Sequence, residues 1–512
     1  MTKEKRPMVP VRKNQVIEVS IEDMTEDGEG IGKLEGYPLF LSNAVVGDRV
    51  EAVVTKPGKG YGYAKVLRII EPSRDRIKPR CPVAGPCGGC QLQSLTYEAQ
   101  LRFKEQKVAA CLSRLGGIDA PPVRPIIGMD EPWGYRNKAQ YPVTAAADGR
   151  IVCGFYGARS HRVVESDGCL LGSPRQTELL TAVREWMEEC GVAPYDEETG
   201  KGVVRHVLIR EASSDGSGRA SDEAFRDHDR NNERNPAMAA CESGLHDRDH
   251  DPNYVSQDRI SSSDMRGRPQ SMVCVVSNKK KLPAADALVK KLSEHGVNSV
   301  SYNINTEKTN VIMGAATCLL SGALYIQDHI GSNTYRISPG SFFQVNKRQT
   351  SRLYEEALKA AGLTGNETVW DLYCGAGTIS LFLAAKAAFV HGVEVVESAV
   401  EDAKVNASLN GITNVDFTAA RAEELLPKLH SEGRLKADVV VVDPPRKGCG
   451  RELIDTLLSL LPEKIVYVSC NPSTLARDVK LLSGAYSLAY VQPVDMFPQT
   501  VGVEAVAQLL KL

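Results

Sequence analysis

The sequence predicts a multidomain protein in which two β domains precede a C-terminal α/β domain. Near the N-terminus, short β-type segments are separated by Gly, Asp and Pro, which is typical of a small barrel of the oligonucleotide-binding type. Short strands recur in the middle of the chain and predict a mostly antiparallel β domain. From about residue 336, apolar runs alternate with amphipathic stretches and predict a Rossmann-like, doubly wound parallel sheet. We therefore expect domains over residues 9–72, 73–335 and 336–512.

Composition narrows the class of protein further. The 512 residues exceed one ordinary domain, and their hydrophobic and charged content is that of a globular protein. No run approaches the roughly 18 apolar residues of a membrane span, and the first residues lead into no apolar signal segment. We therefore expect a cytoplasmic monomer with no membrane partner. The 13 cysteines then favour free thiols, metal ligation or catalysis over a disulfide framework.

The stretch that ends the expected barrel is basic, although the formal net charge of the chain is only -2. Its cations are Lys56, Lys59, Lys65, Arg68, Arg74, Arg76, Lys78 and Arg80. A local basic stripe binds phosphates even when the whole chain is nearly neutral, so it is compatible with a nucleic-acid partner. An ordinary solvated surface is the alternative interpretation.

Three cysteines follow the barrel with the spacing C-x5-C-x2-C, namely Cys81, Cys87 and Cys90. Two glycines between them allow a tight wrap, and Cys169 is a candidate fourth ligand. Four thiolates suit zinc or a [4Fe-4S] cluster, and the spacing does not decide between these two. A helical stretch within residues 91–116 comes next and is expected to pack on the C-terminal domain.

Residues 212–270 are rich in Ser, Asp, Arg, Gly and Asn and hold almost no aliphatic residues. Such a segment buries too little apolar surface to order itself, so we expect a disordered insertion in a hairpin loop. It contains scattered candidate metal ligands, His228, Cys241, His246 and His250. They lack the short fixed spacing of a metal site, so accidental placement is the better interpretation.

A glycine turn follows the first strand of the C-terminal domain, in Tyr373-Cys374-Gly375-Ala376-Gly377. Its glycines allow a ligand to approach the backbone closely at the carboxyl edge of the sheet. Glu394 ends the next expected strand, where a carboxylate can accept hydrogen bonds from ribose hydroxyls. A G-x-G alone is also compatible with a purely structural turn. The succession of strand, glycine turn, helix and strand-end acid favours S-adenosylmethionine as the ligand.

Two further strand ends carry reactive side chains. Asp443 precedes two prolines, which stiffen its loop and direct the carboxylate into the same cleft. Cys470 leaves the next strand, and Asn471-Pro472 then opens a helix whose N-terminus is expected to favour the thiolate. A packed thiol is the alternative for Cys470, and a strand-terminating turn is the alternative for Asp443.

A nucleophilic thiol beside a bound base indicates covalent chemistry on that base. Uracil C5 is a poor nucleophile, so its methylation needs a thiol that adds at C6 and generates an enolate. A base must then remove the C5 proton so that the enzyme is released. Glu504 is the candidate, because a lone carboxylate on an apolar strand is costly unless it has a function.

These motifs together resemble a known family. Asp27–Gly32 and Val45–Val50 resemble the TRAM domain, a small RNA-binding barrel. Nearly the whole chain outside the insertion resembles the RNA uracil-C5 methyltransferases, specifically the ribosomal RNA branch with a TRAM domain and a [4Fe-4S] cluster. The motifs that carry the resemblance are Cys81–Gln93, Gly134–Lys138, Ser341–Asn346, Asp371–Gly377, Asp443–Arg446 and Ser469–Pro472.

The resemblance implies a role for each matching position. It implies S-adenosylmethionine ligands at Gln344, Tyr373, Glu394 and Asp443, a nucleophile at Cys470 and a base at Glu504. It implies cluster ligands at Cys81, Cys87, Cys90 and Cys169, which favours iron-sulfur over zinc. The expected product is 5-methyluridine in 23S, the large-subunit, ribosomal RNA. The alternatives are the same chemistry at the T-loop of transfer RNA, or a non-catalytic iron-sulfur RNA-binding factor.

One position departs from the family pattern. The family usually has His before the Val-Glu pair of the C-terminal motif, whereas this chain has Gly502 before Val503 and Glu504. Any contact or proton relay that the histidine provides is therefore absent here or supplied by another group.

Overall fold

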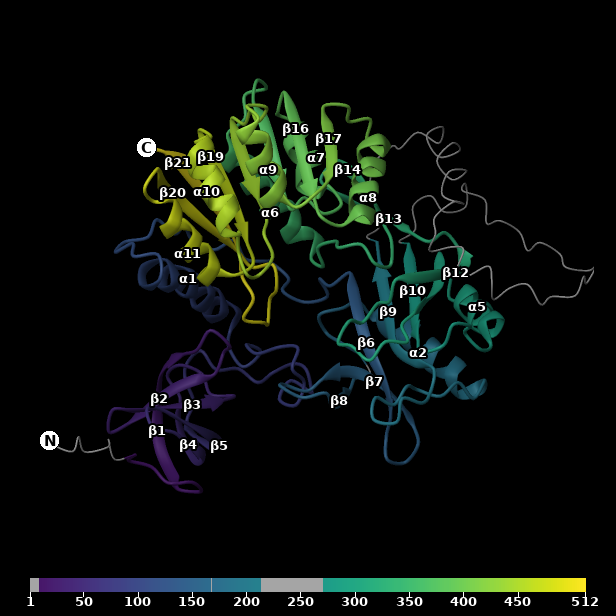
Figure 1. The fold of residues 1–512 in the computed structure, drawn as a ribbon. Coiled ribbons are helices and arrows are strands. Elements are labelled where there is room, and N and C mark those ends of the chain that lie inside the picture. The colour runs from purple at the N-terminus through teal and green to yellow at the C-terminus, as the bar shows by residue number, and fades with distance from the viewer. Residues whose placement is uncertain (1–8, 167, 213–269) are drawn as a thin grey trace, which may run out of the picture.

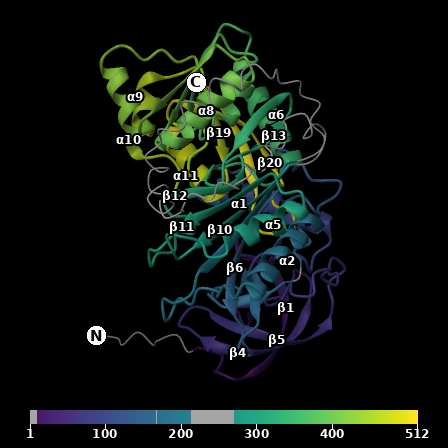
Figure 2. The ribbon, with the colours of Figure 1, turned by 90° about the vertical axis from the view of Figure 1, so that its right-hand side faces the viewer.

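The computed structural model describes residues 9–166, 168–212 and 270–512. Nearly all of the predicted insertion, including His228, Cys241, His246 and His250, lies outside the described residues. The views in Figure 1 and Figure 2 place the N-terminal barrel at the bottom of the molecule and the C-terminal sheet at the top. Within the described residues, no helix is long and apolar enough to cross a membrane.

The N-terminal domain is a closed barrel of five strands, as the sequence predicts. The strands are β1 (Val16–Met24), β2 (Gly30–Leu34), β3 (Tyr37–Ser42), β4 (Arg49–Pro57) and β5 (Gly62–Glu71), in the order β1-β2-β3-β5-β4. Buried and exposed side chains alternate along β1 and β4. The inward residues form one small apolar core that includes Leu39, Leu41 and Val50. Closure leaves the barrel no unpaired sheet edge.

The central sheet has seven strands in the order β12-β11-β10-β9-β6-β7-β8. Their bounds are β6 (Lys138–Ala145), β7 (Ile151–Tyr156), β8 (Val163–Glu165), β9 (Val204–Glu211), β10 (Ser271–Ser277), β11 (Ser299–Ile304) and β12 (Ala316–Gly322). Only the β10–β11 pair is parallel within this sheet. The apolar core beneath it includes residues of α2 (Pro174–Glu189) and α5 (Ala285–Glu294). A separate hairpin of β13 (Ile326–Ile330) and β14 (Asn333–Ile337) leads into the C-terminal domain.

The C-terminal sheet also has seven strands, in the order β17-β16-β15-β18-β19-β21-β20. Their bounds are β15 (Thr368–Leu372), β16 (Phe389–Glu394), β17 (Val415–Ala419), β18 (Val439–Val442), β19 (Lys464–Ser469), β20 (Tyr486–Val494) and β21 (Glu504–Lys511). The strands from β15 to β19 are parallel to one another. Strand β21 runs antiparallel to both β19 and β20. The sequence predicts the parallel part and not the reversal of β21.

Helices cover both faces of this sheet, which is why its strands are apolar along their whole length. One core contains residues of α6 (Lys347–Ala361), α7 (Thr378–Ala384) and α8 (Glu397–Leu409). The other contains residues of α9 (Ala422–Ser431), α10 (Arg451–Leu460) and α11 (Pro472–Leu482). In β18, Val439 and Val441 belong to the first core, and Val440 and Val442 to the second. This is the doubly wound arrangement that the sequence predicts.

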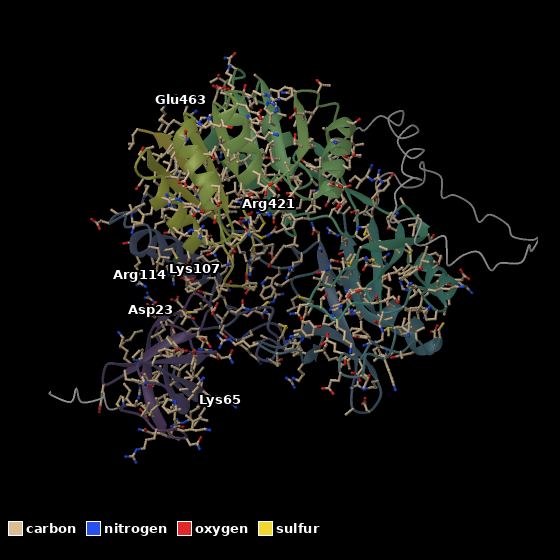
Figure 3. All side chains as sticks on the ribbon, in the orientation of Figure 1. Asp23, Lys65, Lys107, Arg114, Arg421 and Glu463 are labelled. Atoms are coloured by element: carbon tan, nitrogen blue, oxygen red, sulfur yellow. The ribbon has the colours of Figure 1, made fainter. Side chains whose placement is uncertain are left out.

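Helix α1 (Tyr97–Arg114) connects the parts of the molecule. Val108 and Leu112 share the second core of the C-terminal sheet, and α1 contacts α11. Figure 3 labels Lys107 and Arg114 on this helix, between the barrel and the C-terminal sheet. At the barrel end, Met24 packs in one small cluster with Leu92, Leu95 and Val501. The barrel therefore docks against α1 and against the segment that precedes β21.

Candidate active site

The register of the C-terminal sheet brings the predicted site residues to one edge. Leu372 of β15 pairs with Val442 of β18, and Val442 pairs with Tyr467 of β19. The residues after these parallel strands therefore meet at the carboxyl edge. In the antiparallel β19–β21 pair, Ser469 faces Ala505. Continuing this register by one residue brings Cys470, which follows β19, opposite Glu504, the first residue of β21.

The glycine turn after β15 has the strained backbone of a close-approach loop. Tyr373, Gly375 and Gly377 have φ values of 65°, 55° and 75°, in the left-handed region. A Cβ at Gly377 would come within 2.8 Å of the Phe417 ring, so only glycine fits there. Space beside Gly375 is open, because no atom lies within 4 Å of a Cβ built at that position. The turn thus leaves open space for a ligand at the sheet edge, while the N–H groups of Tyr373, Cys374, Gly375 and Gly377 are hydrogen-bonded within the protein.

Glu394 is held by backbone donors at the end of β16. Its Oε2 accepts a hydrogen bond from Gly375 N at 3.1 Å. Its Oε1 accepts from the N–H groups of Val395 and Val396, at 2.8 and 2.9 Å. The carboxylate is therefore fixed beside the glycine turn, where the ribose of a nucleoside would lie.

Two neighbouring aspartates at this edge are weak acids. Burial raises the pKa of Asp371 to about 7, and the nearby charge of Glu394 adds to the effect, although Ser380 Oγ donates to its Oδ2 at 2.5 Å. Burial and the charge of Asp371 also raise the pKa of Asp443 to about 7. Near neutral pH, each of these two carboxyl groups is therefore close to its pKa.

Cys470 precedes Asn471, whose side chain caps α11 by accepting a hydrogen bond from Ser473 N at 3.1 Å. The expected lowering of the thiol pKa by the helix N-terminus does not dominate. Burial, followed by the charges of Glu504 and Asp443, raises the pKa of Cys470 to about 11, against the lowering effects of Arg446 and of a backbone hydrogen bond at Cys470. The thiol form therefore prevails in the ligand-free protein, because burial and, after it, two acidic neighbours disfavour the thiolate.

Glu504 begins β21 and is only 4% exposed. Burial raises its pKa well above the usual value, with a further contribution from Asp443. The segment before it is tight, because a Cβ on Gly502 would come within 3.0 Å of the Phe497 ring. A larger residue at this position would therefore require Phe497 to move.

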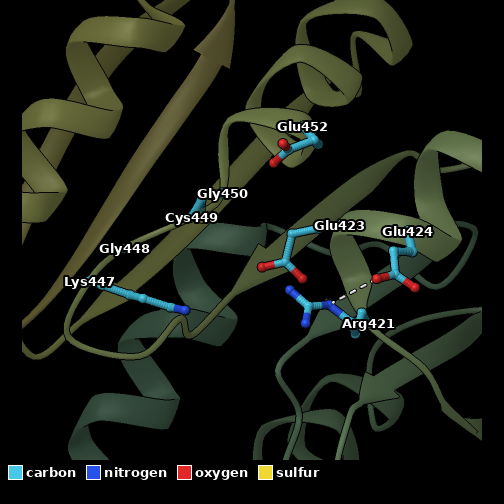
Figure 4. A pocket seen from close by; sticks show the side chains of 8 residues that line it. All are labelled: Arg421, Glu423, Glu424, Lys447, Gly448, Cys449, Gly450 and Glu452. Carbon is cyan, nitrogen blue, oxygen red and sulfur yellow. Dashed lines mark ion pairs between the residues drawn. The ribbon is translucent and has the colours of Figure 1, made fainter.

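A cavity of about 370 Å³ opens at the same edge of the sheet (Figure 4). It is lined by Arg421, Glu423, Glu424, Lys447, Gly448, Cys449, Gly450 and Glu452. Tyr373 reaches this side of the edge, since its hydroxyl donates to Glu423 Oε1 at 2.8 Å. Glu423 is not among the site residues predicted from the sequence, although an acid just after the strand that follows Glu394 is a usable signal.

Gln344 lies on the loop between β14 and α6. It is buried, and its backbone oxygen accepts a hydrogen bond from Asn137 Nδ2 at 3.0 Å. This bond joins two of the motifs that carry the family resemblance. The neighbouring Phe342 is 71% exposed, the largest exposure among the exposed large hydrophobic residues except for the C-terminal Leu512. Phe342 lies in a motif that carries the family resemblance, but no role for it is predicted from the sequence.

The four predicted cluster cysteines come close enough to interact electrostatically. The charges of Cys169 and Cys81 act on Cys87, and burial together with the other three thiols raises the pKa of Cys90 to about 12. Gly89 N donates to Cys87 Sγ at 3.4 Å. Among the described residues, however, no group of three or more His, Cys, Asp or Glu side chains is arranged to hold a metal ion. Four cysteine sulfurs are a donor set that fits a thiolate-bound metal centre. The structure does not show the [4Fe-4S] cluster itself.

Comparison with known proteins places this geometry in a family. Residues 280–511 match the tRNA (Uracil-5-)-methyltransferase family, and residues 10–67 match the TRAM domain. An uncharacterized RNA methyltransferase of Halalkalibacterium halodurans is 43% identical over 98% of this chain and 99% of its own length. The chain belongs to the RNA uracil-C5 methyltransferases. It is an S-adenosylmethionine-dependent enzyme that acts on RNA.

Further relatives support this assignment to the RNA uracil-C5 methyltransferases. An uncharacterized RNA methyltransferase of Listeria innocua is 41% identical over 98% of both chains. The crystal structure of Pyrococcus abyssi tRNA (uracil-54, C5)-methyltransferase, in complex with S-adenosyl-L-homocysteine, superposes with a TM-score of 0.69. That protein is 25% identical, and the match covers 96% of this chain and 100% of the other. The predicted barrel, methyltransferase fold and methyl donor are therefore confirmed.

Proposed function

We propose that this enzyme methylates C5 of one specific uridine through a covalent bond between Cys470 and the base. The observation that supports this most strongly is the β19–β21 register, which sets Cys470 opposite Glu504. Electrostatic coupling of Cys470 to both Glu504 and Asp443 supports a compact reactive group. A thiol and a buried carboxylate are the two groups that this substitution requires.

The proposed reaction proceeds in successive steps on the target uracil. Cys470 first loses its proton. Asp443 is the proposed acceptor of this proton, because its pKa is raised to about 7, near neutral pH. The Cys470 Sγ–C6 bond then forms, and C5 takes the methyl group. Glu504 removes the C5 proton, the C5–C6 double bond re-forms, and the Sγ–C6 bond breaks. S-adenosylmethionine supplies the methyl group as a sulfonium and leaves as S-adenosylhomocysteine.

We assign the methyl donor to the edge formed by the glycine turn and the neighbouring strand ends. Glu394 is fixed by three backbone N–H groups and would bind the ribose. Tyr373, Asp443 and Gln344 complete the set that the family resemblance implies. Glu423, held by the Tyr373 hydroxyl at the cavity, is an additional candidate for contact with the adenine. The exposed ring of Phe342 is suited to stack on the target uracil.

We propose large-subunit ribosomal RNA as the substrate, because the barrel and the run of cysteines resemble the ribosomal RNA branch of the family. Transfer RNA is the second candidate, since the relative from Pyrococcus abyssi that matches over its whole length acts on tRNA. Mass-spectrometric mapping of 5-methyluridine in cells with and without this gene distinguishes the two. Loss at a large-subunit ribosomal position supports the proposal, and loss only in transfer RNA supports the alternative. No loss in either RNA contradicts both.

We also propose that Cys81, Cys87, Cys90 and Cys169 hold a [4Fe-4S] cluster. The supporting observations are the mutual electrostatic influence of the thiols and their all-sulfur donor set. Net methyl transfer moves no electrons, so a structural role is expected. Iron and sulfide analysis of anaerobically purified protein tests this, with zinc as the competing result. Stoichiometric zinc, or no metal with the RNA methyltransferase activity intact, would contradict the proposal.

A further inference from the structure

The barrel carries an aromatic cluster that its own core does not use. Phe40, Tyr61 and Tyr63 lie with ring centroids 5.4, 5.7 and 5.9 Å apart. Tyr61 is 49% exposed, and Phe40 and Tyr63 are partly exposed. None of the three belongs to the apolar core of the barrel. The rings come from β3, the β4–β5 loop and β5, so folding is required to bring them together.

Among the described residues, one lysine each from β4, the β4–β5 loop and β5 lacks an acidic partner. Lys56, Lys59 and Lys65 are exposed and form no ion pair among the described residues. Lys56 pairs in register with Tyr63, and Lys65 follows Tyr63 on the same face of β5. Ion pairs do involve other cations in or just after the barrel, namely Lys33, Arg49, Arg68 and Arg76. Positive charge therefore remains available beside the aromatic rings.

The cluster lies away from the end of the barrel that docks on the rest of the enzyme. Met24, at the end of β1, belongs to the docked cluster. Since β1 and β4 are antiparallel, with Val16 paired to Val53, the β4–β5 loop lies at the opposite end of β1. Figure 3 likewise shows Lys65 farther from the C-terminal sheet than Asp23 is. The β4–β5 loop, with the exposed Tyr61, therefore lies at the end of the barrel away from the docked cluster.

We propose that Phe40, Tyr61 and Tyr63 form a stacking platform for unpaired RNA bases, with Lys56, Lys59 and Lys65 contacting phosphates of the same strand. Exposed aromatic rings bind the faces of unstacked bases, and those faces are hidden inside a duplex. Unpaired lysines provide the complementary charge for the backbone. This inference rests on the proposed function in RNA methylation and adds a second RNA contact outside the catalytic pocket.

The test measures the affinity of the full-length enzyme for a fluorescein-labelled oligouridylate and for a duplex RNA of equal length. The variant Phe40→Ala/Tyr61→Ala/Tyr63→Ala is expected to lose about tenfold or more in affinity for the single strand and little for the duplex. The exposed-ring variant Tyr61→Ala is expected to show part of the same loss without a change in thermal stability. Leu67→Ala is the matched control, because Leu67 is an exposed apolar residue of the same strand.

The lysines are tested by the salt dependence of the same affinity. Replacing Lys56, Lys59 and Lys65 by Ala is expected to flatten the slope of log affinity against log salt, whereas Lys33→Ala, which removes a paired cation, leaves it unchanged. Ultraviolet crosslinking of a 5-bromouridine oligonucleotide is expected to label the peptide that contains Tyr61. Wild-type affinity in Tyr61→Ala and in the triple aromatic variant, or equal losses for duplex and single strand, overturns the platform. Methyl transfer by the wild type to total cellular RNA tests the proposed function separately.

Discussion

At the residue scale, the reactivity of Cys470 is decided by opposing electrostatic effects. Arg446 and a backbone hydrogen bond at Cys470 favour the thiolate, whereas burial, Glu504 and Asp443 favour the thiol and prevail. A bound sulfonium would add positive charge beside these acids and lower their pKa values and that of the thiol. The nucleophile is therefore expected to be activated only when the methyl donor is present.

Replacing Cys470 by Ala is expected to lower methyl transfer at least about a thousandfold, because the Sγ–C6 bond cannot form. RNA affinity should remain close to that of the wild type. The measurement is incorporation of tritium from labelled S-adenosylmethionine into RNA. Cys190→Ala removes an exposed thiol of the central domain and serves as the control. Retained methyl transfer in the Cys470 variant would exclude the covalent route.

Replacing Glu504 by Gln is expected to block release rather than attack. Without the carboxylate, the C5 proton stays in place and the Sγ–C6 bond cannot break. The variant should therefore accumulate a methylated RNA–protein adduct that migrates slowly on a denaturing gel. An inactive variant that forms no adduct would instead indicate that Glu504 is needed before the base is attacked.

The raised pKa values of Asp371 and Asp443 predict a pH dependence of stability. An acid whose pKa is higher in the folded than in the unfolded protein binds its proton more tightly when folded, so stability falls as ionisation proceeds. Both groups rise from 3.8 to about 7, so the loss should extend from about pH 4 to pH 7. Asp443→Asn should reduce this decline in thermal midpoints, whereas the exposed-site control Asp119→Asn should not. An identical decline in both variants would refute the assignment.

At the scale of elements, α1 binds the segment before Glu504 through an ion pair and hydrogen bonds. Lys104 and Asp495 form an ion pair at 2.5 Å, and both side chains are 0% exposed. Tyr97 Oη donates to the other Asp495 oxygen at 2.8 Å, and Lys104 Nζ donates to Phe497 O at 2.9 Å. Gln499 N donates to Gln100 Oε1 at 2.9 Å. The start of β21 is thus positioned by a helix nearly four hundred residues earlier in the sequence.

Lys104→Met is expected to destabilise the protein by about 3–5 kcal/mol, because it leaves the Asp495 carboxylate buried without its cation. Denaturant unfolding measures the loss. The matched control is Lys404→Met, which breaks an exposed pair with Glu401 and should cost less than about 1 kcal/mol. Adding Asp495→Asn to Lys104→Met should recover part of the loss. Equal stability of the two lysine variants would contradict the importance of the buried pair.

At the scale of the whole molecule, the cysteine region is hydrogen-bonded to the catalytic domain. Leu92 N, two residues after Cys90, donates to Gln499 O at 3.0 Å. Tyr135 Oη donates to Pro498 O at 3.0 Å, and the charges of Cys90 and Cys169 act on the same tyrosine. We therefore expect that the segment before Glu504 becomes less ordered when the cysteine region becomes less ordered.

Cys90→Ser is expected to increase amide hydrogen exchange around residues 497–503, because a weakened cysteine region holds Leu92 and Tyr135 less firmly. Mass-spectrometric hydrogen exchange on the full chain measures this. Cys153→Ser, at a buried thiol of β7, is the control and should leave residues 497–503 unchanged. Unchanged exchange in Cys90→Ser would show that the two regions are ordered independently.

The sequence by itself determined the features that depend on local pattern. Short β-type segments separated by Gly, Asp and Pro predicted the barrel, and apolar runs alternating with amphipathic stretches predicted the parallel sheet with covered faces. Strand-end chemistry identified Glu394, Asp443 and Cys470, because residues that follow parallel strands must meet at one edge. The domain bounds, the monomer, the cytoplasmic location and the roles of the site residues stay predictions.

Only the tertiary structure decided the features that depend on contacts distant in sequence. The reversed direction of β21 sets Glu504 opposite Cys470, and no local pattern encodes a strand's direction. The raised pKa of Cys470 follows first from burial and then from the carboxylates of Glu504 and Asp443, which lie elsewhere in the chain. The buried Lys104–Asp495 pair and the ring cluster of Phe40, Tyr61 and Tyr63 also need the folded chain. Burial and electrostatics act through space, so they appear only when the domains are assembled.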